Sequence, residues 1–262
     1  MVLEKMARIG YAAKGIVYII IGLLAVQTAS TVGVETNSTD TEGALNTIAQ
    51  QPFGKLLLAI LTVGLVAYAF WRFIQAIKDP DNEGMDLRGL ASRTGCFFSC
   101  TTYSALAVEA VMLIIGSGGG GGKSKSDWTA LVLQQPFGRW LVAIAGAITI
   151  GVGLSRLYKA YQAKFSRELD LRALNPSQQD LVINISRAGI AARGIVFIMM
   201  GFFLIQAARH YNPDKVRGLD GALQAIAQQP FGKTLLGVVA LGLVAYGAYM
   251  WIQARYRLIK IR

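Results

Sequence analysis

The segment Gln50-Gln51-Pro52-Phe53-Gly54, with the apolar run that continues to residue 77, decides the fold because it occurs three times. The same five residues return at 134–138 and at 228–232. An Arg-X-Gly precedes each copy at nearly the same distance, and a Gln-Ala or Lys-Ala pair follows each glycine at one fixed distance. A pattern repeated at a fixed spacing is typical of tandem copies of one structural unit. We therefore divide the chain into three repeats, covering residues 1–80, 81–165 and 166–262.

Each repeat contains two apolar blocks long enough to cross a membrane. A bilayer core of about 30 Å requires about 20 apolar helical residues. The composition agrees, because only 16% of the residues are charged, whereas soluble domains average about 25%. Long apolar runs without alternation favour helices over strands. The sequence therefore predicts an all-α membrane protein of six transmembrane helices with pseudo-threefold symmetry, its apolar blocks lying near 9–29, 54–77, 95–116, 137–161, 188–208 and 231–254.

The net charge of +11 has a strongly uneven distribution along the chain. Of the 26 Lys and Arg residues, 18 fall on one side of the predicted helices and 8 on the other. Because cytoplasmic loops are enriched in Lys and Arg, we expect both termini and the loops near 79–93 and 162–187 to be cytoplasmic. The basic side is also suited to contact anionic lipid headgroups. No nucleic-acid-binding motif accompanies the charge, so we expect no nucleic acid partner.

The repeated motifs resemble those of a known bacterial family. Repeat one carries Arg8-Ile-Gly-Tyr-Ala-Ala-Lys-Gly-Ile-Val-Tyr18, and it also contains Gln-Gln-Pro-Phe-Gly and Gly64-Leu-Val-Ala-Tyr68. This combination resembles the domain-of-unknown-function family 1206, and the resemblance covers essentially the whole chain. It implies a multipass protein of the bacterial inner membrane, and it brings no established activity. Repeat two departs from the pattern, because Arg93-Thr-Gly-Cys-Phe-Phe-Ser-Cys100 replaces the glycine-rich start.

The Gln-Gln-Pro-Phe-Gly segments predict structural elbows. Proline is tolerated at the first helical position, so we expect each proline to begin a spanning helix. The preceding residues, near 44–51 and 222–229, read as short interfacial helices. A re-entrant element lining a pathway is the alternative. The residues assigned to the elbows are Pro52, Phe53, Gly54, Pro136, Phe137, Gly138, Pro230, Phe231 and Gly232.

Small and basic residues recur near the predicted cytoplasmic edge. Gly15 and Gly22 share a helix face, as do Gly194 and Gly201, which predicts close helix packing, with a glycine-lined conduit as the alternative.

The basic residues of the same helices favour lipid anchoring, because side chains about 9 Å inside the edge still reach the headgroups. A basic cytoplasmic vestibule that binds an anion or an acidic partner is the alternative. These candidate contacts are Arg8, Lys14, Arg93, Arg187 and Arg193, with Ser99 at the equivalent position of repeat two.

Glu109 is a candidate titratable site within the membrane. It lies seven residues before Gly116, hence about 10 Å below the outer edge. Ionisable residues at such depth are costly and often functional. Thr102 shares its helix face, and we expect this face to point into the bundle. A proton or cation site is one interpretation, and a hydrogen-bonded Glu used for packing is the other.

Other motifs give little support for chemistry. Cys96 and Cys100 lie four residues apart on one helix, but two thiols do not make a zinc site, and the single histidine, His210, falls on the opposite side. The run 117–124 resembles a phosphate loop only superficially, because Ser117 stands where glycine is required. No hydrolase motif occurs. We therefore expect no metal, no cofactor and no enzymatic activity.

Three functions remain as hypotheses. The first is a non-enzymatic membrane component that supports partner membrane proteins or lipids. The second is a small ion or solute channel or transporter that uses the pseudo-threefold axis and Glu109. The third is an intramembrane enzyme, for which a bound cofactor would be the first indication.

Overall fold

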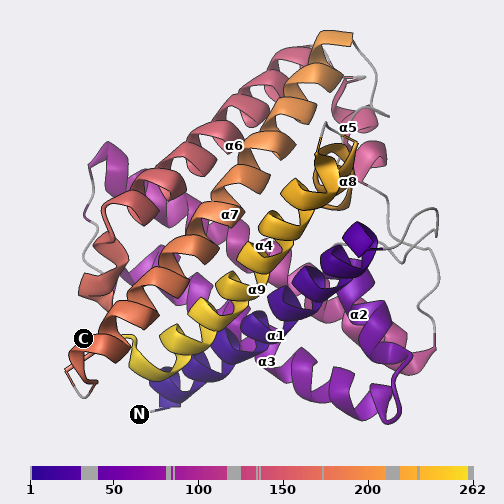
Figure 1. The fold of residues 1–262 in the computed structure, drawn as a ribbon. Helices are drawn as coiled ribbons and strands as arrows, with labels where there is room; N and C mark the ends of the chain where they lie inside the picture. The colour runs from indigo at the N-terminus through magenta and orange to yellow at the C-terminus, as the bar shows by residue number, and fades with distance from the viewer. Residues whose placement is uncertain are drawn as a thin grey trace.

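The computed structural model describes residues 2–30, 41–80, 84, 86–116, 125–133, 135, 137–172, 174–210, 219–228 and 231–258. In these ranges the chain is almost entirely helical (Figure 1). Six helices are long and apolar enough to cross a membrane, which confirms the predicted fold class. They are α1 (Val2–Ser30), α3 (Gly54–Lys78), α4 (Leu87–Ile115), α6 (Gly138–Tyr161), α7 (Pro176–His210) and α9 (Gly232–Tyr256).

Three short helices precede the second long helix of each repeat: α2 (Thr41–Ala49), α5 (Lys125–Leu133) and α8 (Leu219–Ala227). A 3₁₀ turn, η1 (Lys164–Glu168), follows α6. Helix α1 begins and α9 ends at the same end of the bundle, which we call the termini side (Figure 1). The opposite end, where each short helix turns into a long one, is the elbow side.

The elbows are built around a phenylalanine rather than a proline. The second long helix of each repeat begins at the glycine, and Phe53, Phe137 and Phe231 precede it with φ angles of 61°, 65° and 59°. The prediction that proline starts the helix is therefore wrong for Pro52, which lies two residues earlier, and Pro136 and Pro230 lie outside the described residues. The left-handed conformation, costly for a bulky residue, reverses the chain sharply enough to bring the two helices together.

The elbow glycines are required because no space is left for a side chain. A Cβ at Gly138 would lie 1.8 Å from the carbonyl oxygen of Val132, and one at Gly54 would lie 2.3 Å from that of Ala49. Gly232 meets the carbonyl oxygen of Ala227 at 2.1 Å in the same way. Only a residue without a side chain lets the long helix start directly against the end of the short one.

The repeats join through their long helices. The second long helix of each repeat packs on the first of the next, so that α3 contacts α4, α6 contacts α7 and α9 contacts α1. At two of these interfaces the backbones nearly touch. A Cβ at Gly15 would lie 2.9 Å from the carbonyl oxygen of Gly247, and one at Gly194 would lie 2.9 Å from that of Gly153. The close-packing interpretation of the glycines is confirmed, and Gly22 and Gly201 are likewise buried at these contacts.

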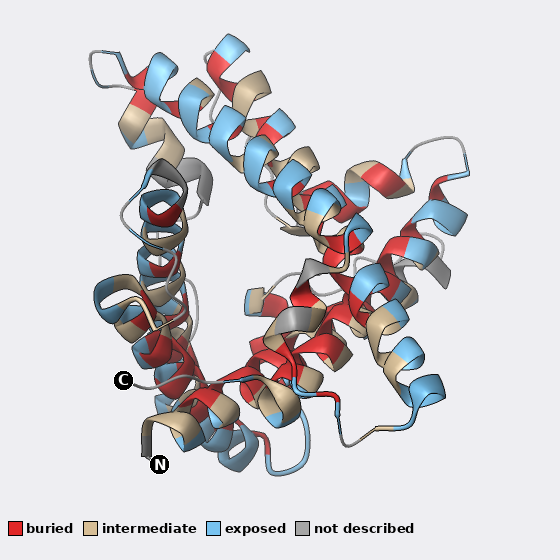
Figure 2. Ribbon diagram, turned by 90° about the vertical axis from the view of Figure 1, so that its left-hand side faces the viewer, coloured by how far each residue is buried: buried red, intermediate tan, exposed pale blue. Residues whose placement is uncertain are grey.

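Within repeats one and three, the two long helices also pack together. The closest contacts are Gly64 against Ala13 and Gly242 against Ala192, where a glycine Cβ would lie 2.3 Å from the alanine Cβ. Helices α1 and α3, and α7 and α9, therefore form tight pairs. Buried residues gather where the long helices meet, and exposed residues cover their outer faces (Figure 2).

Repeat two lacks this internal pairing, since α4 and α6 are not among the packed pairs in the described residues. Counting along the repeats places Ile148 at the position of Gly64 and Gly242, and Phe98 at that of Ala13 and Ala192. These side chains are 62% and 67% exposed. Two bulky residues thus replace the glycine–alanine contact, and the helices cannot approach. We call the faces that remain uncovered the open face of repeat two, formed by Phe98, Thr102 and Glu109 of α4 and by Ala145, Ile148 and Val152 of α6.

Candidate functional site: a central cluster of cations and aromatic rings

Four cations from four helices converge inside the bundle. Lys14 of α1 and Arg193 of α7 occupy one repeat position, where repeat two has Ser99. Arg72 of α3 and Arg156 of α6 occupy a second position, at the same distance after the elbow glycine, where repeat three has Met250. Aromatic rings surround these cations. All six long helices contribute to this central cluster, which consists of Lys14, Arg72, Arg156, Arg193, Tyr18, Tyr68, Tyr103, Phe197 and Tyr246.

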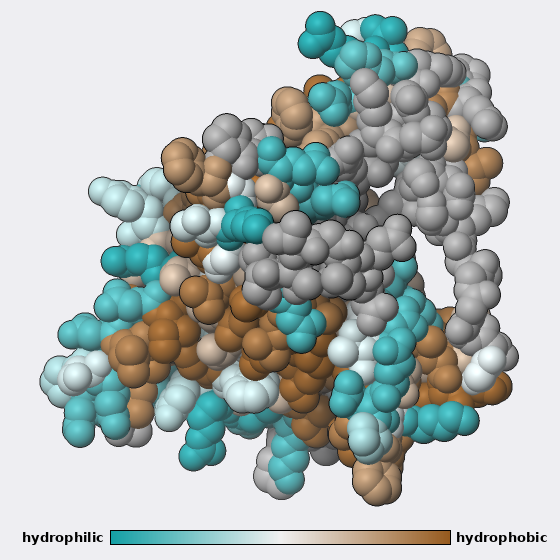
Figure 3. Space-filling model, turned by 45° about the vertical axis from the view of Figure 1, so that its right-hand side comes forward, coloured by the Kyte–Doolittle hydropathy of each residue, from teal (hydrophilic) through white to brown (hydrophobic). Residues whose placement is uncertain are grey.

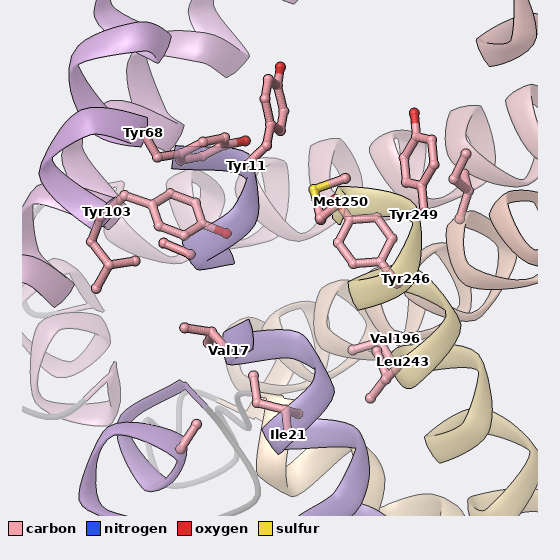
Figure 4. Packing of buried hydrophobic residues seen from close by; sticks show 14 of the residues in the cluster. Tyr11, Val17, Ile21, Tyr68, Tyr103, Val196, Leu243, Tyr246, Tyr249 and Met250 are labelled. Atoms are coloured by element: carbon pink, nitrogen blue, oxygen red, sulfur yellow. The ribbon is translucent and has the colours of Figure 1, made fainter. Parts of the chain in front are cut away.

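Lys14 is held by tyrosines. Its side chain is only 2% exposed, and its Nζ donates a hydrogen bond of 2.7 Å to the hydroxyl of Tyr68. The Nζ lies 4.5 Å from the ring centre of Tyr68 and 5.0 Å from that of Tyr103, with two further rings within 6.0 Å. Figure 4 shows Tyr68 and Tyr103 on one side and Tyr246 on the other, all directed toward the middle of the bundle. The lipid-anchoring interpretation is therefore wrong for Lys14, because its ammonium points inward.

Arg193 has a similar environment. Its guanidinium carbon lies 4.6 Å from the ring centre of Tyr246, 5.0 Å from Tyr18 and 5.2 Å from Phe197. One terminal nitrogen also donates to the Tyr246 hydroxyl. A cation over an aromatic face gains about 0.5–2 kcal/mol, more when water is excluded. Ring faces stabilise such charges without neutralising them.

The two arginines of the second position complete the cluster. Arg72 donates to Oε1 of Gln75 at 2.9 Å and to Sγ of Cys96 at 3.5 Å. Arg156 lies over the ring of Phe197 at 5.4 Å. The Nε atoms of Arg72, Arg156 and Arg193 are buried and have no hydrogen-bond partner among the described residues. Three donors are thus available to an acceptor that the described part of the chain does not supply.

The cluster carries a large excess of positive charge. Lys14 interacts electrostatically with Arg72, Arg156 and Arg193. In the described part of the chain, none of these four residues forms an ion pair with a carboxylate, since the ion pairs there join Glu4 or Glu168 to other cations. Buried charges are normally paired because their removal from water is costly. This arrangement is chemically suited to hold an anion with several oxygen acceptors.

The arginines that open each repeat have a different task. Arg8 donates to the carbonyl oxygens of Ala254 and Arg255, at 2.7 and 2.6 Å. Arg93 donates to those of Ala76 and Ile77, and Arg187 donates to that of Ala160. Each arginine therefore caps the C-terminal end of the second long helix of a neighbouring repeat, which is α9 for Arg8, α3 for Arg93 and α6 for Arg187. A cation at this end also interacts favourably with the helix dipole. These donors are directed at protein backbone, and Arg8 also donates to Glu4, so each arginine has a role within the bundle in addition to the predicted contact with lipid headgroups.

Glu109 and Thr102 lie on the open face of repeat two. Thr102 is exposed, and its hydroxyl donates to the carbonyl oxygen of Phe98 at 2.9 Å, whereas Glu109 is half-buried. The equivalent residues of repeat one, Val17 and Leu24, are buried. The expectation that this face points into the packed bundle is therefore wrong. Glu109 lies ten residues beyond Ser99, hence about 15 Å from the level of the central cluster.

The comparisons with known proteins agree with the repeat structure. The model of a family described as Domain of Unknown Function (DUF1206) matches residues 9–79, 94–163 and 188–257. The chain belongs to the DUF1206 family. It is also 40% identical, over 255 residues, to "Uncharacterized protein YxxB" of Bacillus subtilis (strain 168), an alignment that covers 97% of this chain and 91% of that protein. No solved structure matches the chain. The central cluster lies entirely within the three segments matched by the DUF1206 model.

The cysteines of this DUF1206 chain do not form a metal centre in the described residues. Cys96 and Cys100 are both free thiols, and Cys96 accepts its contact from Arg72. No group of three or more potential metal-ligating side chains occurs within the described ranges. His210 ends α7 on the elbow side, away from the cluster.

Sequence reasoning overlooked half of the cations in the DUF1206 central cluster. Arg72 and Arg156 lie near helix ends on the basic side, where any membrane protein carries cations, so they attract no notice individually. The feature of the sequence that could have identified them is their shared repeat position, since they lie at the same distance after the elbow glycines Gly54 and Gly138. Tyrosines also share a position across repeats one and three, but they are common in membrane helices. Only the convergence of the helices shows that these residues form one site.

Proposed function

We propose that the protein is a non-enzymatic membrane protein that binds an anion in the central cluster. The observation that carries this proposal is the convergence of Lys14, Arg72, Arg156 and Arg193, without a paired carboxylate among the described residues. Three guanidinium Nε atoms in the same place have no acceptor in the described part of the chain. An oxyanion would satisfy both the charge and the donors.

We place this site in the bacterial plasma membrane and open it to the cytoplasm. The excess of Lys and Arg on the termini side supports a cytoplasmic location for both termini. Lys14 lies six residues beyond Arg8, which puts the cluster about 9 Å inside that edge. Arg72, Arg156 and Arg193 are only half-buried, which supports access for a small solute.

A binding role fits the cluster's chemistry better than catalysis. Its polar groups are ammonium, guanidinium and phenol, all of which donate hydrogen bonds to an anion. We therefore propose that the protein supports lipids or a partner membrane protein by holding an anionic group, and that it does not convert a substrate.

Anion transport is a second candidate function. It is favoured by the half-burial of the cluster's guanidiniums and by the ionisable Glu109 about 15 Å farther along repeat two. Flux of phosphate or chloride into proteoliposomes that is abolished in Glu109→Gln would favour transport. Binding without such flux would favour the supporting role.

The proposed function predicts saturable binding of a soluble phosphomonoester. Glycerol 1-phosphate would be titrated into the purified full chain in detergent and followed by calorimetry. Loss of one charged hydrogen-bond donor costs about 1.5–3 kcal/mol, so Arg193→Gln and Arg156→Gln should each weaken binding about 10-fold or more.

The matched control is Arg139→Gln, which removes a cation that stacks on Trp140 at the start of α6, on the elbow side. Its affinity should equal that of the unaltered protein. Absence of saturable binding, or equal losses in all three variants, would refute the proposed site.

A further inference from the structure

The open face is a specific property of repeat two. In the most apolar windows of α4 and α6, only 22% and 17% of the residues are buried, compared with 39–56% in the other four long helices. Ala145 is exposed, although its equivalents Leu61 and Val239 are buried. Val152 is likewise exposed, although tyrosines at its position in the other two repeats are buried. In repeats one and three the two long helices cover these faces by packing against each other. In repeat two the same faces of α4 and α6 stay exposed.

We expect this face, apart from Thr102 and Glu109, to lie against the hydrocarbon of the bilayer. Phe98, Ile148 and Val152 lie in the middle parts of helices that are long enough to span a bilayer. The molecule carries broad apolar surface elsewhere too, because the view in Figure 3 shows hydrophobic residues gathered in one area with hydrophilic ones around it. Acyl chains are the molecules that fill apolar space at this depth.

The open face leads directly to the central cluster. Ile148, Val152 and Arg156 follow one another at four-residue spacing, so they lie on one face of α6. On α4, Tyr103 follows the exposed Thr102 but is itself buried, and its ring centre lies 5.0 Å from the Nζ of Lys14. An apolar track thus ends at a guanidinium that stands among three other cations. An apolar surface that adjoins a cationic one complements an amphiphile with an anionic head.

We infer that the anion held by the central cluster is the phosphate headgroup of an anionic phospholipid, whose acyl chains lie along the open face between α4 and α6. This inference rests on the proposed function, because it assigns the source of the same anion. Four cations favour a headgroup with at least two negative charges, such as a phosphatidate. The lipid reaches the cluster laterally from the bilayer, between α4 and α6, which Phe98 and Ile148 keep from packing together.

The decisive variant closes the open face without altering the cluster. Phe98→Ala combined with Ile148→Gly recreates the alanine–glycine contact of repeats one and three. Its matched control is Phe97→Ala combined with Ile144→Gly, which changes neighbouring residues that are similarly exposed. Circular dichroism and size-exclusion chromatography would verify the fold and the oligomeric state of both double variants.

The measurement compares two ligands on the full chain. Dioleoyl phosphatidate in phosphatidylcholine nanodiscs probes the lipid, and glycerol 1-phosphate probes the headgroup alone. The closing variant should lose phosphatidate affinity about 10-fold or more and keep its affinity for glycerol 1-phosphate, whereas the control variant should match the unaltered protein for both.

Three results would overturn the inference. Unchanged phosphatidate affinity in the closing variant would show that the open face holds no acyl chain, while glycerol 1-phosphate binding would still uphold the proposed function. A change from dimer to monomer without a lipid effect would identify the face as a contact between two copies. Failure of all phosphate binding, in the unaltered protein too, would refute the proposed function itself.

A second measurement uses only the unaltered protein. Phosphatidate with a photoreactive group in its acyl chain should label the α6 segment that contains Ile148 and Val152, and unlabelled phosphatidate should compete with this labelling. Competed labelling at the exposed residues Ile60 of α3 or Val238 of α9, which share the repeat position of Ile144, would contradict the inference.

Discussion

At the scale of single residues, Lys14 shows how a membrane helix holds a buried ammonium. Its charge faces the rings of Tyr68 and Tyr103 and donates one hydrogen bond, but it has no carboxylate partner among the described residues. Cation–π contacts stabilise the charge without removing it, so it stays available to a ligand. Repulsion from the three arginines of the cluster makes the same site costly for the empty protein.

Lys14→Met should therefore weaken anion binding without lowering stability. The thioether side chain fills similar space, and relief of the repulsion should outweigh the lost hydrogen bond, which is worth about 1 kcal/mol. We expect the affinity for glycerol 1-phosphate to fall about 10-fold and Tm to stay equal or rise. Calorimetry and intrinsic-fluorescence melting of the ligand-free protein would measure the two quantities. A lower Tm with unchanged affinity would make Lys14 a structural residue only.

At the scale of helices, close approach decides which elements pair. Helices α6 and α7 meet through Gly153 and Gly194, and α9 and α1 meet through Gly247 and Gly15. Without a hydrophobic force between helices in lipid, such contacts depend on van der Waals packing between backbones. Arg8, Arg93 and Arg187 cap the ends of α9, α3 and α6, respectively. They thereby add polar contacts at the same interfaces. The glycine contacts and the arginine caps both join neighbouring repeats, which explains how the three repeats close into one bundle.

Two glycines of α6 provide a matched test of this packing. A Cβ at Gly153 would lie 2.7 Å from the carbonyl oxygen of Gly194, whereas one at Gly151 would meet nothing within 4 Å. Gly153→Ala should destabilise the protein by about 1–3 kcal/mol because the two helices must separate. Gly151→Ala should be neutral or stabilising by up to about 1 kcal/mol, since alanine favours the helix. Thermal unfolding would measure both, and equal Tm values would contradict the proposed helix contact.

At the scale of the whole molecule, the pseudo-threefold arrangement is interrupted at one place. Three inter-repeat interfaces and two intra-repeat interfaces are packed, and the remaining pair, α4 and α6, is not packed in the described residues. A symmetric bundle would bury all its faces equally. The exception in repeat two instead leaves an uncovered face, apolar except for Thr102 and Glu109, that runs toward the central cluster.

The proposed orientation of the whole molecule is open to direct labelling. In a variant without Cys96 and Cys100, a single cysteine would replace exposed Gln162 on the termini side or exposed Lys233 on the elbow side. A membrane-impermeant maleimide should label the Lys233→Cys protein in intact cells and the Gln162→Cys protein only after permeabilisation. The reverse pattern would place the termini outside, and the central cluster would then face away from the cytoplasm.

The sequence by itself determined the class of the protein, the six spanning helices, the three repeats and the glycine contacts. These features follow from local properties, namely the length of apolar runs and the spacing of motifs along one helix. Spacing also places a residue such as Lys14 at a depth, but it does not say which neighbour the residue faces. Only the tertiary structure decided that Lys14 points into a ring of tyrosines, and that Arg72 and Arg156 join it in one cluster. The open face of repeat two depends on Phe98 and Ile148 together, two residues from different helices whose sizes matter only where the fold would bring them into contact.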